Sequence, residues 1–453
     1  MRTLFLTLLV AATISGCGDS GNPAKSPTTG GGNSSGGSGS GNTAGTKSDD
    51  MGGTSSGTGG SSSSTGGKNE TATGGFSMNG TGKITCGAAI TAQGVDKLSA
   101  TEFTNLSPSK AGLDAMGDDH VFAQGIAVDP SAPGTIYVTI SGYNSATFAE
   151  IPGGMCKSTD SGNTWTPIGK FDQPVNVRVD PKDSKHMYVG DGVRGDTMGF
   201  WVTTDGGDTW TSPKGFVDVS KSFHSSDIYH IEPNPEDFNH VLVSFHGAWN
   251  DCKDFGFGGC TSGIIESFDG GANWTVHDPE PGWAGKGGYD VFMLYAPELK
   301  IGDAKTWLVG SQGAGYWRTV DAGATWKQVT KVSMSHGGAQ LYRTKKGDLY
   351  MGAELTPLMS TDNGETWTGL NEKNGVPSGY YYAIFGDGTS MYTSSNGTKN
   401  QFITALESDP THWMPFNTQT FSAGVFEMAA DHDKGIFYAS TWGSGVQALK
   451  IAK

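Results

Sequence analysis

The stretch Ser158-Thr159-Asp160-Ser161-Gly162-Asn163-Thr164-Trp165 follows a pattern that recurs along the chain: Ser or Thr, any residue, Asp, any residue, Gly, any two residues, Trp. The Asp carboxylate can accept hydrogen bonds from the backbone amides of a tight turn, and Gly supplies the positive φ that other residues resist. The pattern therefore predicts a hairpin whose Trp packs inside a sheet. We expect a structural role for the aspartates of its five copies, Asp160, Asp205, Asp269, Asp321 and Asp362, and a degenerate sixth copy covers 408–413.

A pair of apolar strands joined by a turn precedes each copy, as in Val128-Asp129-Pro130 leading to Ile136-Tyr137-Val138. Seven such units occur, and each hairpin adds two strands to its pair, which predicts seven four-stranded antiparallel blades. The last unit is too short for four strands. The segment 101–108 resembles the strands that follow the hairpins, so we predict that it supplies the missing outer strand and closes the ring. The predicted fold is all-β, a single seven-bladed propeller over residues 86–453.

The repeated motif resembles the Asp box, or BNR repeat, of sialidases, sortilin-type receptors, xyloglucanases and the propellers that assist photosystem assembly. The resemblance implies that the boxes are structural turns on the face opposite the usual ligand site. The resemblance predicts a fold but not a function, because receptors, assembly factors and hydrolases share the motif.

The amino terminus carries an apolar run from Leu4 to Ile14 that leads into Ser15-Gly16-Cys17. The run is shorter than the roughly 18 residues needed to span a bilayer, so it predicts a signal peptide over 1–16. The stretch resembles a bacterial lipobox, which implies cleavage before Cys17 and lipidation of that residue, the only membrane attachment that we expect. Residues 17–85 are dominated by Gly, Ser, Thr and Asn and predict a flexible, disordered linker. We expect a lipid-anchored protein of the cell envelope, at the outer membrane or cell surface.

Assigning Cys17 to the lipid leaves an even set of four cysteines in a compartment that permits disulfides. Cys252 and Cys260 share one Gly-rich loop and form the simplest pair, which leaves Cys86 to pair with Cys156. The net charge of −15, without clustered Lys and Arg, argues against nucleic acid as a partner. We predict a monomer, with neither a cofactor nor a metal site.

The face opposite the boxes should carry the functional loops. These loops are rich in Trp, Tyr, Asp, Asn and His, a mixture that stacks on sugar rings and binds their hydroxyls. They favour a propeller that binds a glycan, or an extracellular or envelope protein. The predicted ligand-binding residues are Tyr143, Asn144, Arg194, His246, Trp249, Trp283, His336, Tyr380, Tyr381 and Trp442.

The alternative function is a glycoside hydrolase, which needs two carboxylates about 5 to 10 Å apart. The resemblance to sialidases is incomplete, because the folded region has few arginines and no Arg-Ile-Pro motif. The resemblance to xyloglucanases is incomplete because that family builds its cleft between two propellers and this chain predicts one. The catalytic candidates are the loop carboxylates Asp191, Asp196, Asp251, Asp290 and Glu354.

A minor alternative is a metal-dependent propeller lyase. It rests on four histidines near the expected ligand face, whose imidazoles could hold a divalent ion together with carboxylates. Their spacing matches no fixed motif. They are His120, His224, His246 and His336.

Overall fold

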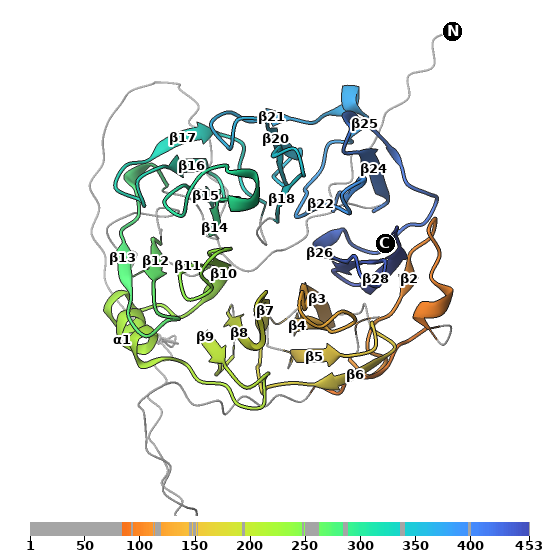
Figure 1. Ribbon diagram of the computed structural model, residues 1–453, viewed down its shortest axis with the longest axis horizontal. Helices are drawn as coiled ribbons and strands as arrows, with labels where there is room; N and C mark the ends of the chain where they lie inside the picture. Colours follow the sequence, from red (N-terminus) through yellow and green to blue (C-terminus); the bar gives the residue numbers. More distant parts are fainter. Residues whose placement is uncertain are drawn as a thin grey trace, which may run out of the picture. The chain divides into compact units, whose positions relative to one another are not determined.

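The computed structural model describes residues 84–91, 94–111, 113, 119–144, 147, 151, 153–192, 195–246, 249, 262–283, 289–335, 340–396 and 400–452. These residues form seven antiparallel sheets arranged as a ring (Figure 1). The predicted seven-bladed all-β propeller is confirmed. Cys17, the linker and the pair Cys252 and Cys260 lie outside the described residues. No described helix is long and apolar enough to cross a membrane.

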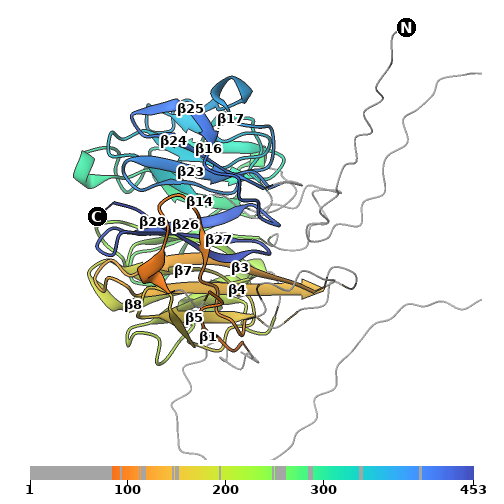
Figure 2. The same ribbon diagram turned by 90° about the vertical axis from the view of Figure 1, so that its right-hand side faces the viewer.

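The blades follow one another in chain order, and each one starts with the strand nearest the ring axis (Figure 1). Blade one contains β3 (Asp119–Val128), β4 (Ile136–Asn144), β5 (Gly154–Ser158) and β6 (Thr164–Pro167), with β1 (Gly87–Ala88) added outside β6. Its β3 and β4 are long and extend past the neighbouring strands at one end of the ring (Figure 2). Blade two contains β7 (Pro174–Asp180), β8 (Asp183–Asp191) and β9 (Gly199–Thr203).

Blade two departs from the repeat in its fourth strand, which is reduced to a single bridge between Val202 and Thr211. The chain then forms α1 (Lys214–Phe223), a helix that the sequence analysis did not predict. Its Phe216 and Phe223 are buried in one cluster with residues of blade three. The helix lies at the outside of the ring (Figure 1).

The remaining blades are four-stranded. Blade three contains β10 (Ile228–Pro233), β11 (Val241–Phe245), β12 (Ile264–Ser267) and β13 (Thr275–His277), and blade four contains β14 (Tyr289–Met293), β15 (Trp307–Ser311), β16 (Gly315–Thr319) and β17 (Lys327–Thr330). Blade five contains β18 (Leu341–Arg343), β19 (Leu349–Met351), β20 (Leu358–Ser360) and β21 (Thr368–Gly369), and blade six contains β22 (Ile384–Gly386), β23 (Ser390–Ser394), β24 (Phe402–Leu406) and β25 (Asp409–Pro415). Blade seven contains β26 (Val425–Asp431), β27 (Ile436–Thr441), β28 (Gly445–Lys450) and β2 (Thr104–Asn105).

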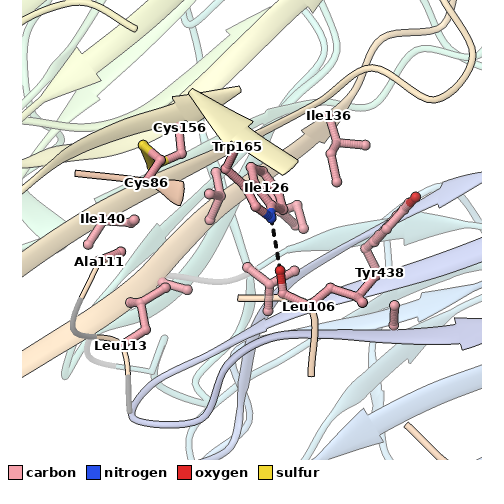
Figure 3. Packing of buried hydrophobic residues seen from close by; sticks show 14 of the residues in the cluster. Cys86, Leu106, Ala111, Leu113, Ile126, Ile136, Ile140, Cys156, Trp165 and Tyr438 are labelled. Carbon is pink, nitrogen blue, oxygen red and sulfur yellow. Dashed lines mark hydrogen bonds between the residues drawn. A yellow bond between two sulfur atoms is a disulfide. The ribbon is translucent and has the colours of Figure 1, made fainter. Parts of the chain in front are cut away.

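The ring closes as predicted, because the N-terminal strand β2 pairs with β28 and places Thr104 opposite Ala448. Leu106, the residue that follows β2, accepts a 2.9 Å hydrogen bond from the indole of Trp165, the Trp of the first box (Figure 3). The predicted disulfide between Cys86 and Cys156 is also present and joins the same N-terminal segment to β5 (Figure 3). Blade one is therefore tied to the strand that completes blade seven.

The five boxes share one hydrogen-bond pattern, seen around Asp160. The Ser158 hydroxyl donates to Asp160 Oδ1 and accepts from the Gly162 amide, and Asp160 Oδ1 also accepts from the Thr164 amide. Each box joins the third strand of a blade to the fourth strand, or in blade two to the bridge that stands in its place, so all five lie at one end of the ring. In the fourth box, hydrogen bonds from the hydroxyls of Thr319 and Thr325 and from the Thr325 amide lower the pKa of Asp321 to about 2.

Candidate functional site

The end of the ring opposite the boxes, which we call the upper face, carries the loops that follow the second strands and those that precede the first strands. An aromatic group occupies this face between blades six, seven and one. It consists of Phe122, Tyr143, Tyr382, Phe426 and Trp442, and we call it the Trp442 cluster. Phe122 belongs to β3 and Tyr143 to β4, Tyr382 precedes β22, Phe426 belongs to β26 and Trp442 follows β27.

Trp442 is the centre of this cluster. Its ring centroid lies 4.7 Å from that of Phe122, 5.3 Å from that of Tyr382, and 5.4 Å from that of Phe426, on which it stacks. Tyr143 joins through Phe122 at 5.7 Å. Phe122 and Tyr382 are buried, whereas Tyr143, Phe426 and Trp442 keep part of their surface exposed. The cluster therefore presents aromatic surface to solvent on a packed support.

Polar groups border the cluster. The Asn396 amide donates a 3.1 Å hydrogen bond to the Tyr382 hydroxyl and accepts a bond from the Gly424 amide. Burial raises the pKa of Tyr382 to about 12, so this tyrosine remains a neutral hydroxyl. Among the described residues, the buried indole N–H of Trp442 has no hydrogen-bond partner. Such a donor loses hydration without compensation, a cost that the buried Tyr350 hydroxyl in the core also carries.

A second group on the upper face lies between blades five and six. Tyr380 is 44% exposed and lies close enough to Glu354 for the charge of that carboxylate to act on its hydroxyl. Partial burial and the Glu354 charge raise the pKa of Tyr380. The Asn396 amide, at 2.7 Å from the Tyr380 carbonyl, joins this pair to the Trp442 cluster. The structure thus brings together two predicted residues here, Glu354 and Tyr380, and two others, Tyr143 and Trp442, in the cluster.

Three of the predicted aromatic ligand-binding residues lie in the core instead of on the surface. Trp283 and Tyr381 have no exposed side-chain surface, and Trp249 stacks on Phe223 of α1 with ring centroids 4.2 Å apart. A side chain without accessible surface cannot contact a ligand from solvent. Sequence reasoning placed them in loops correctly but could not see that the loops fold inward.

The carboxylates that were predicted as catalytic candidates differ in how deeply they are buried. Asp191 is fully buried, accepts hydrogen bonds from the Gln173 amide and the Thr197 hydroxyl, and burial raises its pKa to about 8. Asp290 is buried too, with Oδ1 3.9 Å from Nδ1 of His230. Asp196 is exposed and Glu354 is half-buried. The two accessible carboxylates among the described candidates are therefore Asp196 and Glu354.

The remaining predicted residues have local roles or lie outside the described part of the chain. His246 Nδ1 lies 2.9 Å from Asp227 Oδ2, and Asn144 accepts hydrogen bonds from the backbone and hydroxyl of Thr147. His224 caps the end of α1. Within the described ranges, no group of three or more His, Cys, Asp or Glu is placed to hold a metal ion. The structure does not describe Arg194, Asp251, His336 or the side chain of His120.

Sequence reasoning missed a cavity of about 320 Å³ in the ring interior, lined by residues of the inner strands. Its charged side chains are largely engaged with the protein: Arg178 forms a 3.0 Å ion pair with Glu427. Gln340 donates to the Met428 carbonyl and accepts from its amide, which links blades five and seven. The polar side chains that line the cavity therefore mainly link the inner strands of different blades. A charged residue in an otherwise apolar strand, such as Arg178 in β7, was its only sequence signal.

The known proteins that resemble this chain in sequence are xyloglucanases. No family model matches the chain. It is 28% identical over 360 residues to a xyloglucanase of Hypocrea jecorina, covering 66% of this chain and 40% of that protein. It is 24% identical over 291 residues to a xyloglucanase of Paenibacillus sp., covering 56% of this chain and 27% of that protein. The chain spans less than half the length of these curated relatives.

Comparison with solved structures gives matches at lower sequence identity. An ancestral GH74 enzyme superposes with a TM-score of 0.46 at 14% identity, over 78% of this chain and 48% of that one. The extracellular domain of a hybrid two-component system protein from B. thetaiotaomicron superposes with a TM-score of 0.49 at 12% identity, over 72% of this chain and 40% of that one. The chain is therefore a seven-bladed propeller whose sequence is similar to xyloglucanases.

Proposed function

We propose that this protein binds a polysaccharide of the xyloglucan type through its upper face. The observation that carries the proposal is the Trp442 cluster, which offers partly exposed aromatic rings beside amide and hydroxyl groups. The C–H faces of sugar rings stack on aromatic surfaces, and sugar hydroxyls exchange hydrogen bonds with polar neighbours. None of the five cluster residues is charged, which suits a neutral glycan. The matches to xyloglucanases support the same ligand class.

The test compares binding of xyloglucan oligosaccharides to the purified full-length protein and to two variants. Trp442→Ala removes the centre of the cluster and should weaken affinity about fivefold or more, since one buried aromatic contact is worth on the order of 1 kcal/mol or more. Phe268→Ala is the matched control, because Phe268 is an exposed aromatic residue in a box on the opposite face. A folded Trp442→Ala protein that binds as tightly as wild type would contradict the proposal.

Hydrolysis of the bound glycan is the second candidate function, and the matches to xyloglucanases favour it. An enzyme of this kind needs a carboxylic acid and a second carboxylate flanking the scissile bond. The accessible carboxylates among the described candidates are Glu354, in the loop after β19 of blade five, and Asp196, in the loop after β8 of blade two. Because these blades are not neighbours, each residue would act with a different second carboxylate. If hydrolysis occurs, Glu354→Gln or Asp196→Asn should lower product release about 100-fold or more while binding persists. Binding by wild type without any released product would exclude this candidate and leave the binding function.

The proposed location is the cell envelope. In this proposal residues 1–16 are a signal peptide, Cys17 carries the lipid, residues 17–85 are a flexible linker and residues 86–453 are the propeller. The lipobox-like sequence and the Gly- and Ser-rich composition of the linker support this organisation. A long linker would allow the upper face to reach an extended polysaccharide.

A further inference from the structure

Leu355 combines two unfavourable features on the upper face. Its φ is +73°, in the left-handed region that favours glycine, and its side chain is 61% exposed. A branched apolar residue with positive φ strains the backbone, and its exposure to water adds no hydrophobic stabilisation. The fold therefore gains nothing from a leucine at this position.

The other described non-glycine residues with positive φ have evident structural reasons. Ser161, Ala322 and Asn363 occupy the turns of Asp boxes, and His224 and Lys300 cap helix ends. Leu355 lies instead in the loop between β19 and β20. The loops between the second and third strands of blades four and seven also contain a residue with positive φ, but there it is a glycine, Gly313 or Gly443. A leucine held in this conformation is strained, and strain of this kind occurs at binding and catalytic sites, where the surroundings enforce the conformation.

The backbone on both sides of Leu355 is held in place. The Glu354 amide donates to the Ser333 carbonyl at 2.9 Å, and the Leu355 carbonyl accepts from the Gly379 amide at 3.2 Å. The second bond joins Leu355 to the segment that carries Tyr380. The strained conformation thus fixes the position of an exposed leucine relative to an exposed tyrosine.

Tyr380 and Glu354 add an aromatic ring, a hydroxyl and a carboxylate beside the apolar side chain of Leu355. The Tyr380 side chain is 44% exposed, and the Glu354 carboxylate lies close enough for its charge to act on the Tyr380 hydroxyl. A carboxylate beside an aromatic ring and an aliphatic side chain can accept hydrogen bonds from hydroxyls while the apolar surfaces contact a sugar ring. Through Asn396 the three residues are continuous with the Trp442 cluster.

We propose that Leu355, Tyr380 and Glu354 form a subsite for one neutral sugar ring at the edge of the upper face. The ring lies against Leu355 and Tyr380, and Glu354 accepts hydrogen bonds from its hydroxyls. Leu355 is a specificity-determining residue whose backbone strain is retained for ligand contact. This inference rests on the proposed glycan-binding function and deepens it.

The test is Leu355→Gly in the full-length protein, measured by thermal melting and by affinity for xyloglucan oligosaccharides. Glycine relieves the strain, so the melting temperature should rise by about 1 to 3 °C. Loss of the leucine contact should weaken affinity about fivefold. Leu406→Gly is the control, because Leu406 is also an exposed leucine, at the end of β24, and lies outside the positive-φ set. It should leave affinity unchanged and should not raise the melting temperature.

The possible outcomes separate this inference from the function on which it rests. Higher stability with weaker binding for Leu355→Gly supports the subsite. Binding that depends on Trp442 but is unchanged in Leu355→Gly overturns the subsite and leaves the proposed function intact. Equal losses in Leu355→Gly and Leu406→Gly also overturn it, because they indicate a general effect. If wild type binds no xyloglucan oligosaccharide, the proposed function and the subsite both fail.

Discussion

Replacing Asp191 by Asn should make the stability of the propeller less dependent on pH. Asp191 is fully buried, and burial raises its pKa to about 8, so the folded protein holds this carboxyl protonated at neutral pH. The unfolded chain ionises it near its ordinary pKa of about 3.9. Between these values the folded state binds one more proton than the unfolded state. Stability from this group is therefore complete below pH 4 and is lost as the pH rises toward 8.

The magnitude follows from the size of the shift. Each unit of pKa difference corresponds to about 1.4 kcal/mol, so the wild-type free energy of unfolding should lose up to about 4 kcal/mol from this group between pH 5 and pH 8. An Asn can accept from the Gln173 amide and donate to the Thr197 hydroxyl without ionising. Asp191→Asn should thus remove most of that loss, whereas the exposed Asp196→Asn should not.

Urea denaturation of the three proteins at pH 5 and pH 8 measures this difference. Parallel pH dependence in wild type and Asp191→Asn would refute the reasoning. The same variant also tests catalysis, because a pKa near 8 is suited to a general acid. Complete burial makes us expect unchanged glycan binding and, if any occurs, unchanged hydrolysis. A stable Asp191→Asn protein that has lost only hydrolysis would show that Asp191 reaches the substrate.

Two further predictions concern the amino-terminal half of the chain. Replacing both Cys86 and Cys156 by Ala should lower the free energy of unfolding by about 4 kcal/mol, since their sequence separation of 70 closes a long loop in the unfolded chain; an unchanged urea midpoint would argue against it. Cys17→Ser should move the protein from the membrane fraction to the soluble fraction of the cell envelope, and continued membrane association would exclude a lipid at Cys17 as the only anchor.

The fold was predictable because its signals are local and repeated. In each box, hydrogen bonds among residues two and four positions apart fix the hairpin, as those between Ser158, Asp160 and Gly162 do. The closing strand was predictable because segment 101–108 looks like the strands that it replaces. Helix α1 was not predictable from the repeat, because it stands where the fourth strand of blade two shortens to one bridge.

The site was less predictable because burial depends on contacts between distant segments. Trp249, Trp283 and Trp442 all follow strands or lie in loops, and their sequence surroundings are similarly polar and Gly-rich. The first stacks on Phe223 and the second packs in the core of blades three and four, whereas the third remains partly exposed. Composition predicted a ligand face, but only the packing shows which of its predicted residues, such as Trp442, Tyr380 and Glu354, keep accessible surface.

The two ends of the ring differ in how fully their side chains are used to stabilise the fold. This difference helps to choose between glycan binding and glycan hydrolysis. At the box end each Asp accepts bonds from its own turn, which leaves little freedom for other chemistry. At the upper face, Trp442 keeps aromatic surface exposed and Leu355 has a strained backbone, and neither feature stabilises the fold. Both features favour ligand contact, and neither supplies an acid or a base. Hydrolysis would require a second carboxylate near Glu354 or near Asp196, and these two residues belong to blades five and two. The Glu354→Gln and Asp196→Asn variants therefore test separately whether either carboxylate cleaves a glycan that this face holds.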